Sequence, residues 1–280
     1  PYTTLFRSIF YSEELLKDNI DNLKLANQLQ YAIKNRELTL YYQPQFSLSS
    51  GKITGVEALV RWIHPEMGFI PPDKFIPIAE ETGQIYEIEK WIINTALHQK
   101  ALFEQDGRED IDISINLSSK ALASEMNFYA VEKLFSSYDI DYTHITIEIT
   151  ETAIISDIGT AVDRLKKLKK LGMKIALDDF GTGYSSLIHL KELPIDIVKL
   201  DRSFIKGIEG DSKNAMIIKA ILYLTKDLNY EVVAEGIESI EQLEYLIKYK
   251  CQTGQGYLMS RPITIEDLCE KLEFGFEWKL

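Results

Sequence analysis

"MKIALDDFGTGYSS", residues 173–186, combines the pattern of a buried strand with a polar, glycine-rich turn. Its first half is apolar almost throughout, which is typical of a strand buried on both faces in a parallel sheet. Two adjacent aspartates, Asp178 and Asp179, end the apolar run, and a glycine-rich turn follows them. Neighbouring side chains on a strand point to opposite faces. We therefore expect the chain to turn out of the sheet here, so that both carboxylates reach one end of it.

Seven more short runs are rich in β-branched and apolar residues, and helical patterns lie between most of them. The predicted strands cover residues 38–46, 53–62, 111–118, 144–150, 173–179, 195–201, 230–236 and 250–257. The predicted helices cover residues 21–35, 91–105, 157–172, 211–228 and 239–249. Strands that alternate with helices in this way predict an α/β fold, a (β/α)₈ TIM barrel. The connection 47–52 is too short for a helix, so the barrel is modified and its first strand is antiparallel.

Composition excludes several classes of function. The chain has 280 residues and a formal net charge of -12, so it lacks the basic surface that duplex DNA or an anionic membrane would need. It contains no run of 18 apolar residues. The two cysteines and four histidines are scattered and form no zinc pattern. We expect a cytoplasmic segment without membrane contact, although a longer protein could carry an anchor upstream.

Polar residues lie in the predicted strands, most of them at or near the carboxyl ends, where TIM-barrel enzymes place their active sites. These residues are Glu57, Asn116, Glu148, Asp178, Asp179, Lys199, Asp201, Glu235 and Gln255. A set of carboxylates with one asparagine suits Mg²⁺ or Mn²⁺ rather than zinc. A pair of such ions would serve phosphoryl transfer or hydrolysis. A glycosidase is an alternative, but it needs only two carboxylates.

At these positions the sequence closely resembles the EAL-domain family of bacterial cyclic di-GMP phosphodiesterases. The resemblance covers roughly residues 25–275 and rests on seven motifs in order. They are "GVEALVRWIHPEMGFIPPDKFIPIAEETG" (55–83), "NLS" (116–118), "EITET" (148–152), "DDFGTGYSSL" (178–187), "KLDRSFI" (199–205), "AEGIE" (234–238) and "QGYLMSRP" (255–262). The resemblance implies a modified TIM barrel with an antiparallel first strand, and hydrolysis of cyclic di-GMP to linear pGpG by a two-metal mechanism.

The resemblance also implies roles for individual residues. It implies that Glu57, Asn116, Glu148 and Asp178 bind one divalent cation, Mg²⁺ or Mn²⁺, and that Asp178, Asp179 and Glu235 bind a second. It gives catalytic roles to Glu57, Lys199 and Glu235, and substrate contacts to Gln43, Leu59, Arg61, Asp201 and Gln255. Glu151 would anchor the loop that follows Asp179. The alternative within the family is a catalytically inactive domain that binds cyclic di-GMP as a receptor.

The amino-terminal segment predicts a longer protein. "PYTTLFRS", residues 1–8, reads as the translation of a sequencing-library adapter, so we exclude it from the fold. Residues 9–22 resemble the linker that follows an upstream domain, and residues 23–280 would form the phosphodiesterase domain. The resemblance implies a GGDEF or sensor domain upstream, and a homodimer formed through the barrel.

Overall fold

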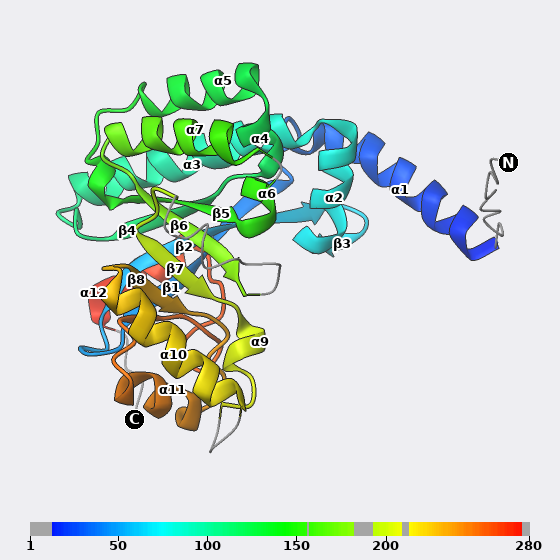
Figure 1. Ribbon diagram of the computed structural model, residues 1–280. Coiled ribbons are helices and arrows are strands. Elements are labelled where there is room, and N and C mark those ends of the chain that lie inside the picture. The colour runs from blue at the N-terminus through cyan, green and yellow to red at the C-terminus, as the bar shows by residue number, and fades with distance from the viewer. Residues whose placement is uncertain (1–12, 156, 182–192, 209–212, 276–280) are drawn as a thin grey trace, which may run out of the picture. The chain divides into compact units, whose positions relative to one another are not determined.

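The computed structural model describes residues 13–155, 157–181, 193–208 and 213–275 (Figure 1). The chain divides into two compact units. One consists of Pro1–Thr39 with Arg61–Ile88, and the other of Leu40–Val60 with Glu89–Leu280. No helix in the described ranges is long and apolar enough to cross a membrane.

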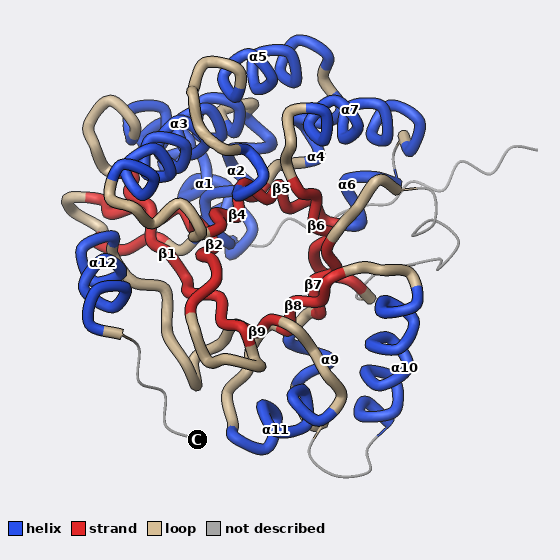
Figure 2. The backbone as a smooth tube through the Cα atoms, turned by 90° about the vertical axis from the view of Figure 1, so that its left-hand side faces the viewer, coloured by secondary structure: helices blue, strands red, loops and turns tan. Residues whose placement is uncertain are grey.

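The second unit contains a closed ring of eight strands (Figure 2). In order around the ring they are β1 (Leu38–Ser47), β9 (Thr253–Gly254), β8 (Glu231–Ala234), β7 (Ile197–Leu200), β6 (Lys174–Phe180), β5 (Ile145–Thr150), β4 (Asp112–Asn116) and β2 (Ile53–His64). A pairing of β1 with β2 closes the ring. Strand β1 runs antiparallel to β9. Each of the neighbouring pairs from β2 with β4 round to β8 with β9 is parallel. The predicted modified TIM barrel with an antiparallel first strand is confirmed.

Helices lie outside this ring (Figure 2). They are α3 (Ile85–Gln105), α4 (Ser119–Ala123), α5 (Glu125–Phe135), α6 (Glu151–Ile155), α7 (Ile158–Lys170), α9 (Arg202–Ile205), α10 (Lys213–Asp227), α11 (Ile240–Lys248) and α12 (Ile265–Phe274), with a 3₁₀ turn at Tyr142–His144. Side-chain caps define their starts: Asp157 accepts a hydrogen bond from the Thr160 N–H, and Ser239 forms a capping box with Gln242. Helices α3, α7, α10 and α11 lie on predicted ranges, although α3 begins before the predicted residue 91. Helices α5 and α12 were not predicted, and α4, α6 and α9 have too few turns to leave a periodic pattern.

The first unit has its own small core. It contains α1 (Glu13–Ala32), β3 (Gly68–Ile70) and α2 (Pro72–Thr82), and β3 pairs with the end of β2 through Trp62 and Ile70. Trp62 is fully buried, its ring packs edge-on against Phe75, and its Nε1–H donates to the Glu37 carboxylate at 2.9 Å. A buried indole needs such a partner for its N–H.

A bulge in β6 corrects one expectation. The strand does not end at the two aspartates but continues to Phe180, and its register against β7 shifts between Leu177 and Phe180. Asp179 has φ of +54°, in the left-handed region. A bulge breaks the alternation of side chains and re-aims them. The extra residue, rather than a turn out of the sheet, therefore accounts for the placement of the adjacent carboxylates.

The backbone at Asp179 generates the first prediction. Glycine adopts the left-handed conformation without strain, whereas a β-branched residue does not. We expect the chain with Asp179→Val to have a free energy of unfolding about 1–3 kcal/mol below that with Asp179→Gly. Urea denaturation of the two variants, both of which lack the carboxylate, measures the difference. Equal stability would show that the bulge does not require this conformation.

Close packing around Gly256 generates the second prediction. A Cβ placed on Gly256 would lie 2.2 Å from the backbone N and O of Ile237. The backbone would have to move, so Gly256→Ala should lower the free energy of unfolding by about 1–3 kcal/mol. Gly159, in the first turn of α7, is the matched control because its nearest neighbour would lie at 3.7 Å. Gly159→Ala should cause no loss, and similar losses at both positions would refute the packing argument.

Candidate functional site

The centre of the site is a buried ion cluster at the carboxyl ends of the barrel strands. Lys199, on β7, is 1% exposed, and its ammonium contacts four carboxylates contributed by other strands or strand ends. The distances from Nζ are 3.4 Å to Glu57, 2.5 Å to Glu148, 3.4 Å to Asp178 and 2.8 Å to Glu235. The structure thus brings together the acids and the lysine that the sequence predicted at this end.

Two amides complete this layer. Asn116, at the end of β4, donates from Nδ2 to Oε1 of Glu57 at 2.9 Å. Gln255, just after β9, donates from Nε2 to Oε2 of Glu57 at 2.8 Å and to Oε1 of Glu235 at 3.2 Å. Both oxygens of Glu57 are therefore held by amide donors, which fixes the side chain at one orientation.

The remaining acids lie next to this cluster. The N–H of Asp179 donates to Oδ1 of Asp178 at 2.9 Å. Burial, followed by the charges of Asp178 and Asp201, raises the pKa of Asp179. Asp201 follows β7 and caps α9 by accepting from the Ser203 N–H at 2.9 Å. Asp201, which was predicted to contact the substrate, is thus also a helix cap.

The charge balance of the cluster is unfavourable without a further cation. Burial raises the pKa of Glu148 well above its usual range, and the charge of Glu57 adds to the effect against the opposing Lys199. Burial opposes ionisation of Glu57 as well, but Lys199 and the hydrogen bonds from Gln255 and Asn116 outweigh it and lower its pKa. Burial disfavours the ammonium of Lys199, yet the four carboxylates raise its pKa well above the usual value. Four carboxylates therefore share one ammonium.

The donor set suits a hard divalent cation. Carboxylate and amide oxygens are the ligands that Mg²⁺ and Mn²⁺ prefer. Buried charged side chains in proteins are either paired with an opposite charge or bound to a metal ion. As they stand, the described residues contain no group of three or more His, Cys, Asp or Glu side chains arranged to hold a metal ion. The acids contact the Lys199 ammonium instead. The chemistry of the set therefore fits divalent cations, with the ammonium now satisfying the oxygens they would bind.

Four further residues were predicted to contact the substrate or anchor the loop. Gln43 on β1 and Leu59 on β2 are partly buried, and each is two positions from a buried neighbour in the layer on the same strand. Arg61 belongs to the other unit. Glu151 begins α6, but residues 182–186 of the loop it was expected to anchor lie outside the described residues.

Sequence analysis missed one buried polar residue of the layer. Gln45, on β1, donates from Nε2 to Oε1 of Gln255 at 3.0 Å. Its position two residues after Gln43 places both on one face of the strand. That period of two was the available signal, but a strand that runs antiparallel does not bring its carboxyl end to the shared end of the others.

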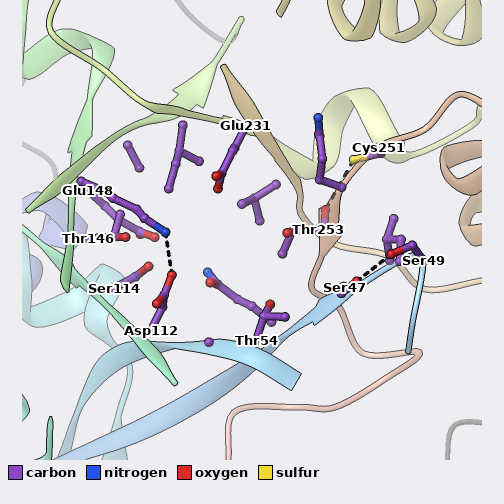
Figure 3. Close-up of a pocket in the computed structure, with 18 of the residues that line it drawn as sticks. Ser47, Ser49, Thr54, Asp112, Ser114, Thr146, Glu148, Glu231, Cys251 and Thr253 are labelled. Carbon is purple, nitrogen blue, oxygen red and sulfur yellow. Dashed lines mark hydrogen bonds and ion pairs between the residues drawn. The ribbon is translucent and has the colours of Figure 1, made fainter. Parts of the chain in front are cut away.

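A cavity of about 620 Å³ lies on the amino-terminal side of this layer (Figure 3). We call it the amino-end cavity. Gln45 and Glu148 border it toward the layer, while Asp112 and Lys174, the first residues of β4 and β6, pair at 3.0 Å beside it. Figure 3 also shows Ser114 and Thr146 around this space, where TIM barrels usually carry large branched side chains. Small side chains at these inward positions explain why the barrel contains a cavity on this side of the layer.

The pKa of Glu235 generates a prediction for the metal-free protein. Burial raises it to about 8, with Asp178 and Glu57 adding to the effect and Lys199 opposing it. The folded state therefore binds a proton that the unfolded state has lost, so this contribution to stability is complete below about pH 4 and disappears as pH rises through 8. With EDTA present, the free energy of unfolding of Glu235→Gln relative to that of the wild type should therefore increase by on the order of 2 kcal/mol from pH 5 to pH 8.

Urea denaturation at each pH measures this difference. Glu231→Gln is the matched control, because Glu231 is exposed at the other end of the same strand. Its stability curve should stay parallel to that of the wild type. A parallel curve for Glu235→Gln would contradict the raised pKa.

Known proteins resemble the chain in sequence over most of its length. The bifunctional diguanylate cyclase/cyclic di-GMP phosphodiesterase MucR of Pseudomonas aeruginosa is 38% identical over 259 residues, which are 92% of this chain and 38% of that protein. The cyclic di-GMP phosphodiesterase PdeR of Escherichia coli is 34% identical over 253 residues, 90% of this chain and 38% of that protein. The chain therefore spans well under half the length of these curated relatives.

Solved structures resemble it in fold. The PaMucR phosphodiesterase in complex with c-di-GMP has a TM-score of 0.83 at 39% identity, covering 88% of this chain and 99% of that one. The EAL enzyme Bd1971, bound to cAMP and cyclic di-GMP, has a TM-score of 0.84 at 35% identity, covering 91% of this chain and 69% of that one. Residues 26–262 match the family described as the EAL domain, and these residues include the whole ion cluster. The chain belongs to the EAL-domain family.

Proposed function

We propose that the chain hydrolyses one phosphodiester bond of cyclic di-GMP and releases linear pGpG. The observation that carries the proposal is the layer of four carboxylates around Lys199 at the carboxyl ends of the strands. The names of MucR and PdeR as phosphodiesterases support the reaction, and the c-di-GMP complex of PaMucR supports the ligand.

Two divalent cations, Mg²⁺ or Mn²⁺, would be held by this layer and its neighbours. We assign Glu57, Asn116, Glu148 and Asp178 to one ion, and Asp178, Asp179 and Glu235 to the other. Such ions lower the pKa of a water and neutralise the charge that develops on the phosphoryl group. The hydrogen bond from Asn116 to Glu57, the contacts of Glu57, Glu148 and Asp178 with one ammonium, and the raised pKa of Glu148 and Glu235 support the assignment.

The protein side chains have separate tasks in this proposal. Glu57 and Glu235 are fixed by amide hydrogen bonds, so they offer their remaining lone pairs in set directions. Lys199 is the fixed positive charge that can orient the attacking water or stabilise the phosphoryl oxygens. Substrate contacts are assigned to Gln43, Leu59, Arg61, Asp201 and Gln255, and loop anchoring is assigned to Glu151.

The setting of the domain is also a proposal. Because the chain spans 38% of MucR, and MucR is named as bifunctional, a GGDEF or sensor domain upstream fits the resemblance. From the family resemblance we also propose that the chain forms a homodimer and acts in the cytoplasm.

Incubation of the pure chain with cyclic di-GMP and Mn²⁺ or Mg²⁺, followed by separation of the nucleotides, tests the function. The wild type should produce pGpG. Glu57→Ala should reduce turnover at least about 100-fold, because loss of residues that merely orient metal ligands already costs 10–100-fold. Glu231→Ala, at the opposite end of the barrel, should retain full turnover.

Two outcomes would contradict the proposal. Tight binding of cyclic di-GMP by the wild type without pGpG would identify a receptor. Unchanged turnover in Glu57→Ala, with an unchanged urea curve, would remove Glu57 from the metal site.

A further inference from the structure

Two glutamines from opposite ends of the sequence form a buried pair beneath the acidic layer. Gln45 and Gln255 are 7% and 4% exposed. Nε2 of Gln45 donates to Oε1 of Gln255 at 3.0 Å, and Nε2 of Gln255 donates to Glu57 at 2.8 Å and to Glu235 at 3.2 Å. The pair therefore links β1 to two carboxylates of the site.

The direction of these bonds is constrained by chemistry. A glutamine amide has one donor end and one acceptor end, whereas an ionised carboxylate only accepts. Gln255 must turn its NH₂ toward Glu57 and Glu235, and its carbonyl oxygen then faces Gln45. A donor at residue 45 satisfies that oxygen, whereas an acceptor there would compete for the NH₂.

Gly55 leaves room for this donor. A Cβ at residue 55 would lie 3.3 Å from Oε1 of Gln45 and 3.0 Å from the Cβ of Asp112. A side chain at residue 55 would therefore crowd the Gln45 amide. Gly55 therefore leaves space for the Gln45 amide, two residues before Glu57 on the same strand.

We infer that Gln45 is a positioning residue for the metal site: its amide selects the orientation of Gln255, which holds Glu57 and Glu235 in place. The inference rests on the proposed function, because it needs cations at these carboxylates. Groups that orient metal ligands typically contribute 10–100-fold to metal affinity or activity. Gln45 itself bonds Gln255 rather than either carboxylate, so it would act through Gln255.

The amino-end cavity makes the inference testable by substitution. Gln45 lines this cavity together with the small side chains Ser114 and Thr146, so an altered side chain has space beside it. Gln45→Glu keeps the size of the side chain but, when ionised, offers only acceptors, which would draw the Gln255 NH₂ away from the carboxylates. Gln45→Leu offers neither donor nor acceptor.

A matched control lies in the same cavity. Gln252 uses its Oε1 to accept from the Val232 N–H at 3.2 Å. Gln252→Glu keeps an acceptor at that position. It adds a negative charge beside the same cavity, at an exposed position, without a recorded contact to Gln255.

Titration of the 280-residue chain with Mn²⁺, followed by electron paramagnetic resonance of the free ion, gives the affinity. We expect Gln45→Glu to raise the Kd for Mn²⁺ by 10–100-fold and Gln45→Leu to raise it less. Added negative charge alone would lower the Kd for Mn²⁺, whereas loss of positioning would raise it, so the two effects predict opposite changes in Kd. Gln252→Glu should leave the Kd unchanged or slightly lower, and urea denaturation reports whether each variant is folded.

A second readout needs no metal. The side-chain amide signals of Gln255 in a ¹H–¹⁵N spectrum are identified by their loss in Gln255→Met. In the metal-free protein, Gln45→Glu should shift them, because the NH₂ changes partners, whereas Gln252→Glu should not.

An unchanged Kd and unmoved Gln255 signals in folded Gln45→Glu would overturn the inference, while wild-type pGpG formation would leave the proposed function intact. A wild-type chain that binds no Mn²⁺ and forms no pGpG would overturn both.

Discussion

The interaction on which the site depends is the contact of one buried ammonium with four carboxylates. Burying charge is costly unless partners compensate it, and Lys199 compensates only part of the negative charge that the strands bring to this end. The surplus is visible in the raised pKa of Glu148 and Glu235. Such a surplus of negative charge is the physical basis for the proposed binding of cations. The parallel strands make the arrangement possible, because their carboxyl ends meet at one end of the barrel.

The sequence was sufficient to predict the barrel and most of the layer. Apolar runs of strand length recur between helical patterns, and the six-residue connection after the first run allowed only a hairpin. Acids at successive strand ends then had to converge, because a closed ring leaves them one shared end. Glu57, Glu148, Asp178, Glu235 and Lys199 follow from this geometry without knowledge of any side-chain contact.

Other features depend on interactions that the sequence does not display. The left-handed conformation of Asp179 arises from a bulge against β7, and nothing local distinguishes this aspartate from Asp178. Asp201 sits at a strand end like the other acids, yet its carboxylate caps α9. Gln45 gains its role from a residue 210 positions away. Tertiary contacts decided each case, and only the hydrogen-bond partners reveal them.

The shortest strand of the ring has a consequence for motion. Strand β9 is two residues long, and it pairs with β1 through Phe46 with Gly254 and Ser47 with Thr253, beside a hydrogen bond from the Leu48 N–H to the Gln252 carbonyl. Segments with few backbone pairings are the ones that open first in native proteins. Gln255 lies directly beyond this seam, and its bond to Gln45 crosses it. An excursion that parts the seam would break this bond, so closure of the barrel and the orientation of the Gln255 amide are linked.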